Sequence, residues 1–117
     1  MVTEVRQGDV YWLDFGPVAG SAPGYRHPCV VVQSDTFNRS PLATTVVCLI
    51  TSNMKRGLAP GNVTLQKGEG SLAKACVVNV SQIMTVDKSE LEERIGRLQA
   101  GTVDRIRNGL HLLIDRD

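Results

Sequence analysis

The chain has 117 residues, of which 42% are hydrophobic and 4% aromatic, and its formal net charge is +1. This length suits one domain, residues 1–117, with an aliphatic core, and a charge so near zero indicates no class of partner by itself. No apolar stretch approaches the ~18 residues that cross a bilayer, and segment 1–9 lacks a signal peptide's apolar region, so the sequence predicts a soluble, cytoplasmic protein.

Five short apolar segments separated by glycine and proline are predicted as β-strands. Segments 29–33 and 45–50 are continuous apolar runs, which indicate strands buried on both faces. Trp12 lies within the first strand and is predicted to be a core residue. So many short strands in so few residues favour a compact barrel. The five predicted strands are residues 10–15, 29–33, 45–50, 62–66 and 76–80.

The last third of the chain changes to a helical period. Ser89 and Glu92 have the spacing of a capping box, which predicts the start of a short helix. Segment 95–98 either extends that helix or forms one more strand. Thr102 is the predicted N-cap of a C-terminal helix that packs on the sheet through one apolar stripe. The stripe consists of Val103, Ile106, Leu110 and Leu113.

Each of the three cysteines, Cys29, Cys48 and Cys76, lies within or at the start of an apolar run. Their spacing contains no C-x-x-C pair, and no pair of histidines lies near them. The sequence therefore predicts buried thiols, with neither a disulfide nor a metal site.

Arg26 and Thr51 are the candidate functional residues. Arg26 follows a segment of small residues, 16–25, that is predicted to move over a ligand, and it precedes the apolar run 29–33. Thr51 follows the apolar run 45–50. A guanidinium and a hydroxyl at the ends of two buried strands suit the binding of a phosphate.

The positive charge of the chain is concentrated in residues 51–75. This segment carries Lys55, Arg56, Lys67 and Lys74 against one acidic residue, Glu69. A local positive field beside a polar site favours an anionic ligand. The alternative is a pair of solvated loops.

The order and spacing of short motifs along nearly the whole chain resemble the MazF/PemK (Kid) family of toxin endoribonucleases. The motifs are Gly8-Asp9-Val10-Tyr11, Gly20-Ser21, Arg26-His27-Pro28, Gln33-Ser34-Asp35, Ile50-Thr51-Ser52, Pro60-Gly61-Asn62-Val63, Val77-Val78-Asn79-Val80-Ser81-Gln82, Thr85-Val86-Asp87-Lys88 and Ile95-Gly96-Arg97-Leu98.

This resemblance implies a mainly β, SH3-like small barrel with short helices and a C-terminal helix, assembled as a homodimer. It implies a toxin of a type II toxin–antitoxin pair, which cuts single-stranded RNA without a metal or other cofactor. A MazE-like antitoxin then occupies the RNA groove with its C-terminal segment. The family's two catalytic positions fall on Arg26 and Thr51.

The chain departs from many relatives at three positions. Ser81 stands where an acidic residue is common, Met84 where an arginine is common, and His27 where a second arginine is common. The first change removes a candidate general base. Together the changes are expected to alter which RNA is bound, and the recognised bases stay open.

The chemistry follows from the substrate, because RNA carries its own nucleophile in the 2′-hydroxyl. Arg26 suits stabilisation of the charge that builds on the phosphate oxygens, and Thr51 suits a hydrogen bond to the same group. DNA lacks the 2′-hydroxyl, so the scheme predicts cleavage of RNA alone, leaving 2′,3′-cyclic phosphate and 5′-hydroxyl ends.

The proton-transfer group is not assigned by the sequence. His27 has a suitable side chain, but neighbours on a strand face opposite sides, so His27 either joins Arg26 or points away. The predicted RNA-contacting residues combine an aromatic ring, amides, hydroxyls and cations. They are Tyr25, His27, Ser52, Asn53, Lys55, Arg56 and Gln82.

Two other functions stay open at this point. One is a CcdB-like toxin, which shares the barrel but binds DNA gyrase without nuclease activity. The other is a barrel that binds RNA without cleaving it. Arg26 and Thr51 argue against the gyrase binder, which needs neither residue.

Overall fold

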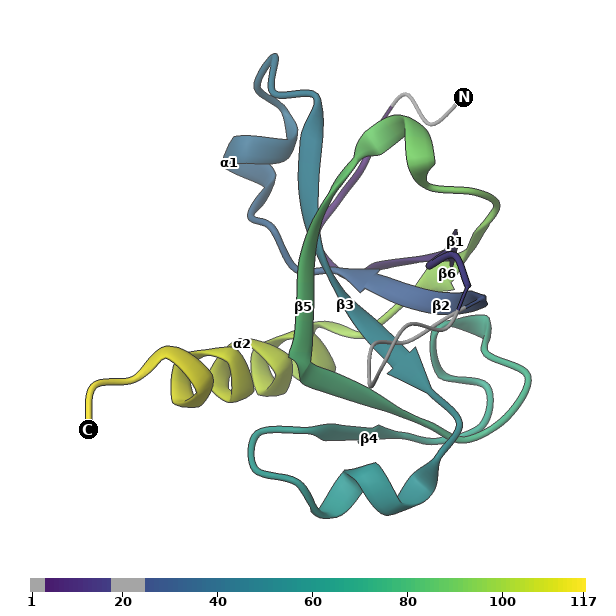
Figure 1. Cartoon of the computed structure of the whole chain (residues 1–117), viewed down its shortest axis with the longest axis vertical. Helices are drawn as coiled ribbons and strands as arrows, with labels where there is room; N and C mark the ends of the chain where they lie inside the picture. The colour runs from purple at the N-terminus through teal and green to yellow at the C-terminus, as the bar shows by residue number, and fades with distance from the viewer. Residues whose placement is uncertain (1–3, 18–24) are drawn as a thin grey trace.

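A computed structural model describes residues 4–17 and 25–117. Within them the chain forms a six-stranded antiparallel sheet that curls into a half-barrel, with one long helix packed at its side (Figure 1). The strand order is β4-β5-β3-β2-β1-β6. The mainly β prediction is therefore confirmed. The strands are β1 (Asp9–Asp14), β2 (Arg26–Val31), β3 (Thr44–Thr51), β4 (Val63–Leu65), β5 (Cys76–Asp87) and β6 (Arg94–Arg97).

The helical elements are short apart from the last one. The described helices are α1 (Asp35–Asn38) and α2 (Ala100–Ile114), and the 3-10 turns are η1 (Met54–Leu58), η2 (Glu69–Ser71) and η3 (Lys88–Glu90). In the described part of the chain, no helix combines the length and the apolar character needed to cross a membrane.

Strand β5 is much longer than the predicted segment 76–80. It continues to Asp87 because a bulge lets one strand pair with β3 in two registers, Leu49 with Asn79 and Cys48 with Ile83. The sequence signal stopped early because the strand's second half is mostly exposed, so its apolar run breaks off at Ser81.

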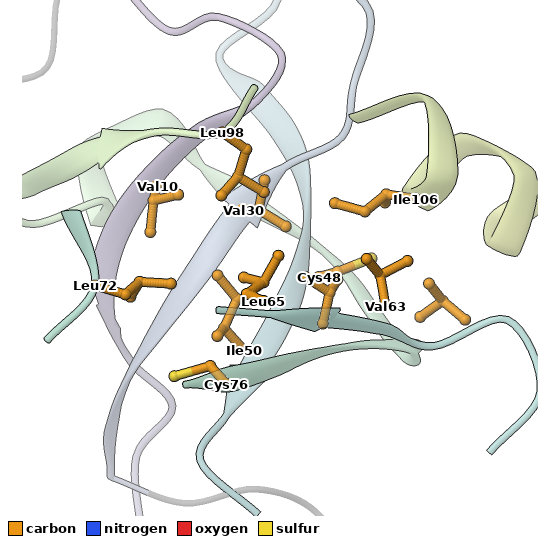
Figure 2. Close-up of a cluster of buried hydrophobic side chains, with 12 residues drawn as sticks. Val10, Val30, Cys48, Ile50, Val63, Leu65, Leu72, Cys76, Leu98 and Ile106 are labelled. Atoms are coloured by element: carbon orange, nitrogen blue, oxygen red, sulfur yellow. The ribbon is translucent and has the colours of Figure 1, made fainter. Parts of the chain in front are cut away.

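Side chains on the two faces of the sheet form two cores. The first core lies between the sheet and α2, and its cluster includes Val10, Ile50 and Ile106 (Figure 2). The second core lies on the other face and contains Cys29 and Val31, while Val30 between them belongs to the first. Alternation along β2 therefore buries both faces, as the continuous apolar run predicted.

The three cysteines are buried free thiols, as predicted. Burial raises the pKa of both Cys29 and Cys48 to about 12, since a thiolate is poorly solvated there. Both side chains therefore serve as small core residues.

Three predictions about the last third of the chain need correction. Ser89 starts no helix, since the chain makes one 3-10 turn and then β6, so segment 95–98 falls largely within a strand. Helix α2 is capped at Gln99, whereas the Thr102 hydroxyl donates to the Glu69 carboxylate. Ile106 is buried as predicted, but Leu113 is 43% exposed, because the helix runs beyond the sheet.

Helix α2 packs against the loop before β4 through two glycines. A Cβ built on Gly109 would lie 2.0 Å from the carbonyl oxygen of Gly61, so the backbones touch directly. We expect Gly109→Ala to lower the free energy of unfolding by at least ~2 kcal/mol, since overpacking against backbone cannot relax by rotamer changes. Urea denaturation of the purified protein measures this change.

Gly101→Ala is the matched control in the same helix. A Cβ at Gly101 meets nothing within 4 Å, so alanine there is expected to leave stability unchanged or to raise it by up to ~1 kcal/mol. Equal effects of the two substitutions would contradict the close packing of Gly61 and Gly109.

Candidate functional site

A cleft of about 420 Å³ opens where β2 begins and β3 ends. These ends lie together because β2 and β3 are antiparallel neighbours. Arg26 and His27 from β2, Ser52 after β3 and Lys74 before β5 bring polar groups to the cleft. Its apolar floor includes Trp12 and Ile50. A shallow apolar floor with cationic and hydroxyl groups at its rim suits a ligand with both bases and phosphates.

Arg26 is held on the rim by two contacts. Its guanidinium carbon lies 4.4 Å from the centre of the Trp12 ring, and its Nε donates to Oε1 of Glu92 over 2.7 Å. The Arg26 and Glu92 side chains are 48% and 40% exposed, so water weakens this ion pair. Trp12 is half-buried in the cleft, which corrects its predicted place in the core.

Glu92 is the site residue that the sequence did not reveal. It follows η3, 66 positions after Arg26, and its backbone N–H donates to the carbonyl of Trp12 over 2.9 Å. This bond places Glu92 alongside β1, so the Arg26 side chain reaches across β1 toward it. The carboxylate that suggested a capping box binds a guanidinium instead.

Thr51 is the last residue of β3, which lies next to β2 on the side away from β1. Its hydroxyl oxygen accepts the N–H of Asn53 over 3.1 Å, which closes a small turn and leaves the hydroxyl proton available to a ligand. Alternation along β3 puts Thr51 on the face of the second core, with Val47, whereas Ile50 belongs to the first core. Arg26 and Thr51 therefore share one edge of the sheet but point to opposite faces, and Ser52 lines the cleft with Arg26.

His27 points to the same face as the second core. Its ring meets the ring of Phe15 edge to face, with centroids 6.0 Å apart and planes at 63°. Phe15 in turn packs against the second core. Edge-to-face packing restricts the orientation of both rings.

The other predicted RNA-contacting residues lie outside the lining of the cleft. The Asn53 side chain accepts the N–H of Lys55 over 3.2 Å and starts η1, where Lys55 and Arg56 are exposed. Tyr25 is 67% exposed, and its φ of 64° lies in the left-handed region. Gln82 is half-buried on β5 and lies outside the cleft lining.

Part of the expected site lies outside the described residues. This applies to Gly20 and Ser21 and to most of the predicted closing segment, 16–25. Among the residues that the structure does describe, His, Cys, Asp and Glu side chains form no group of three that could hold a metal ion.

Known proteins resemble this chain in sequence over nearly all its length. The family model described as PemK-like, MazF-like toxin of type II toxin-antitoxin system matches residues 6–114. Endoribonuclease MazF6 of Mycobacterium tuberculosis is 39% identical over 111 residues, covering 95% of this chain and 97% of that protein. Endoribonuclease MazF of Staphylococcus saprophyticus is 35% identical over 109 residues, covering 92% and 89%.

Solved structures resemble it in fold as well. MazF from Deinococcus radiodurans is 26% identical with a TM-score of 0.79, and the match covers 98% of this chain and 100% of that one. A MazE-MazF structure from the same organism is 26% identical with a TM-score of 0.73, covering 96% of each chain.

Proposed function

Because the chain belongs to the PemK-like, MazF-like family of toxins of type II toxin–antitoxin systems, we propose that it is a sequence-specific endoribonuclease that cleaves single-stranded RNA. The observation that carries this proposal is the 39% identity to an endoribonuclease over 95% of the chain. The cleft with Arg26, Ser52 and Lys74 supports it, because these side chains suit a sugar–phosphate strand. In this proposal residues 1–117 act as one toxin domain in the cytoplasm, where cellular RNA is found.

In the proposed reaction Arg26 and Thr51 both bind the scissile phosphate at the edge of the sheet. Arg26 reaches it from one face of the sheet and Thr51 from the other. Within the described part of the chain only Nε of Arg26 is hydrogen-bonded, so the two terminal nitrogens present their N–H groups to a phosphate. The exposed pair with Glu92 is worth only ~0.2–1 kcal/mol, so a phosphate displaces it at little cost. Thr51 donates its hydroxyl proton while accepting from Asn53.

The ribose 2′-oxygen then attacks the phosphorus, and the bond to the 5′-oxygen breaks. Negative charge grows on the non-bridging oxygens, where a guanidinium stabilises it most. The products are a 2′,3′-cyclic phosphate and a 5′-hydroxyl, with mRNA, tRNA and rRNA all possible substrates. No metal or cofactor takes part in this scheme. Translation and growth stop because messages or translation RNAs are cut.

The proposed partners follow from the same family. A neighbouring structure is described as an endoribonuclease in complex with its cognate antitoxin from a mycobacterial species, at 22% identity and a TM-score of 0.75. We place a MazE-like antitoxin on this chain and a homodimer as its active form. An antitoxin that covers the cleft blocks RNA by occupying Arg26 and its neighbours.

The test is cleavage of total cellular RNA and of DNA of matched sequence, both in excess EDTA. We expect cuts in the RNA only, at one short sequence, with cyclic-phosphate and 5′-hydroxyl ends. Cleavage that requires a divalent ion, or cuts in DNA, would contradict the scheme. Inhibition of gyrase without RNA cleavage would support the CcdB-like alternative instead.

A further inference from the structure

His27 connects the two halves of the proposed site. It lines the cleft together with Arg26 and Ser52. Its ring, however, packs on Phe15 at the border of the second core, which is the face of the sheet that Thr51 shares. His27 therefore lies beside Arg26 in the cleft and shares a face of the sheet with Thr51, the two residues that are proposed to hold the phosphate.

The pairing of β2 with β3 brings His27 and Thr51 to the same edge of the sheet. Strands β2 and β3 pair antiparallel, and their last pair is Cys29 with Leu49. The next residue of β2 is Pro28, which has no N–H to donate to β3. His27 and Thr51 each lie two residues beyond this last pair, so alternation along both strands puts them on the same face at the same edge of the sheet. A phosphodiester that contacts both side chains would lie at this edge.

The reaction needs a proton at the leaving 5′-oxygen, and the neighbouring side chains supply it poorly. A guanidinium does not give up its proton in proteins, and a threonine hydroxyl is too weakly acidic to donate readily. Histidine is the side-chain type that changes its protonation near neutral pH.

We infer that His27 is the catalytic proton donor to the 5′-oxygen of the leaving strand, an inference that rests on the proposed function. The 2′-oxygen forms a bond to phosphorus and its proton passes to water. The bond from phosphorus to the 5′-oxygen breaks, and this oxygen takes the proton of the His27 imidazolium. The product is a 5′-hydroxyl and a neutral imidazole, which regains a proton from solvent.

Sulfur in place of the leaving oxygen tests this role. Two oligoribonucleotides carry the cleavage sequence mapped in total RNA, one unmodified and one with a bridging 5′-phosphorothiolate at the scissile position. A thiolate leaves without a proton donor. On the unmodified RNA we expect His27→Ala and His27→Gln to lower kcat by ~10²–10⁴-fold. On the phosphorothiolate we expect both variants to cleave within about threefold of the unchanged protein.

Equal losses on the two RNAs would overturn the inference, because a structural or base-contacting role, or proton acceptance from the 2′-hydroxyl, is not rescued by sulfur. His111→Gln is the matched control, because His111 lies exposed on α2. This variant is expected to cleave both RNAs at the rate of the unchanged protein. If His27→Ala unfolds the protein, His27→Gln still tests the inference, because glutamine keeps a polar side chain beside Phe15. Failure of the unchanged protein to cut either RNA would reject the endoribonuclease function itself, and this inference with it.

Discussion

Replacing Arg26 by alanine is expected to lower RNA cleavage by ~10²–10⁴-fold, the size of a lost group that stabilises charge in the transition state. The reason is the placement of its charge. The guanidinium lies over the Trp12 ring at the cleft, and the Arg26 side chain is 48% exposed. Single-turnover cleavage of an oligoribonucleotide with the mapped sequence measures the loss. A 2′-deoxy analogue is not cut, so its gel mobility shift measures binding alone. This measurement separates a slower chemical step from weaker RNA binding.

Arg26→Ala should leave the fold intact, because its side chain is half exposed and contributes only a surface ion pair and one ring contact. Arg107→Ala is the matched control, since Arg107 forms an exposed pair with Asp104 on α2. A variant at position 26 with full activity would remove Arg26 from the reaction.

The ion pair with Glu92 gives a second check on the same assignment. Glu92→Gln removes the competing carboxylate and keeps the side chain's length, so RNA binding is expected to stay equal or tighten, by up to about fivefold for an exposed pair. A loss of activity as large as that of Arg26→Ala would show that Glu92 itself acts on the substrate.

Replacing Thr51 by valine is expected to lower the rate of cleavage by ~10–10²-fold, the size of one lost hydrogen bond to a charged group. Valine has nearly the same shape, so the second-core face keeps its packing. Thr51→Ser keeps the hydroxyl and is expected to retain most of the activity. Rates under single-turnover conditions with saturating protein report on the chemical step.

The Thr51 hydroxyl also accepts the N–H of Asn53, so valine removes a turn contact as well. Thermal unfolding of each variant separates that effect from chemistry. Thr64→Val is the control, because Thr64 is exposed on β4 and away from the cleft. If serine and valine at position 51 lower the rate equally, the hydroxyl has no role.

The sequence predicted the elements of the fold that depend on local patterns of apolar residues. The apolar runs at 29–33 and 45–50 became strands buried on both faces, and the stripe around Ile106 became the packed side of α2. The mainly β class and the family also followed from the sequence, since both depend on the order of motifs along the chain. The end of β5 did not, because its exposed half carries no apolar run.

At the site, the sequence marked Arg26 and Thr51 as polar residues at the ends of two strands, because each stands next to an apolar run. Only the tertiary structure decided where their side chains point. Pairing of β1 with β2, and of the Glu92 backbone with Trp12, brings Glu92 to Arg26 from 66 positions away. The antiparallel pairing of β2 with β3 brings His27 and Thr51 to the same edge and the same face of the sheet. Burial follows local hydrophobicity, whereas which polar groups meet depends on strand order and register, which are properties of the whole sheet.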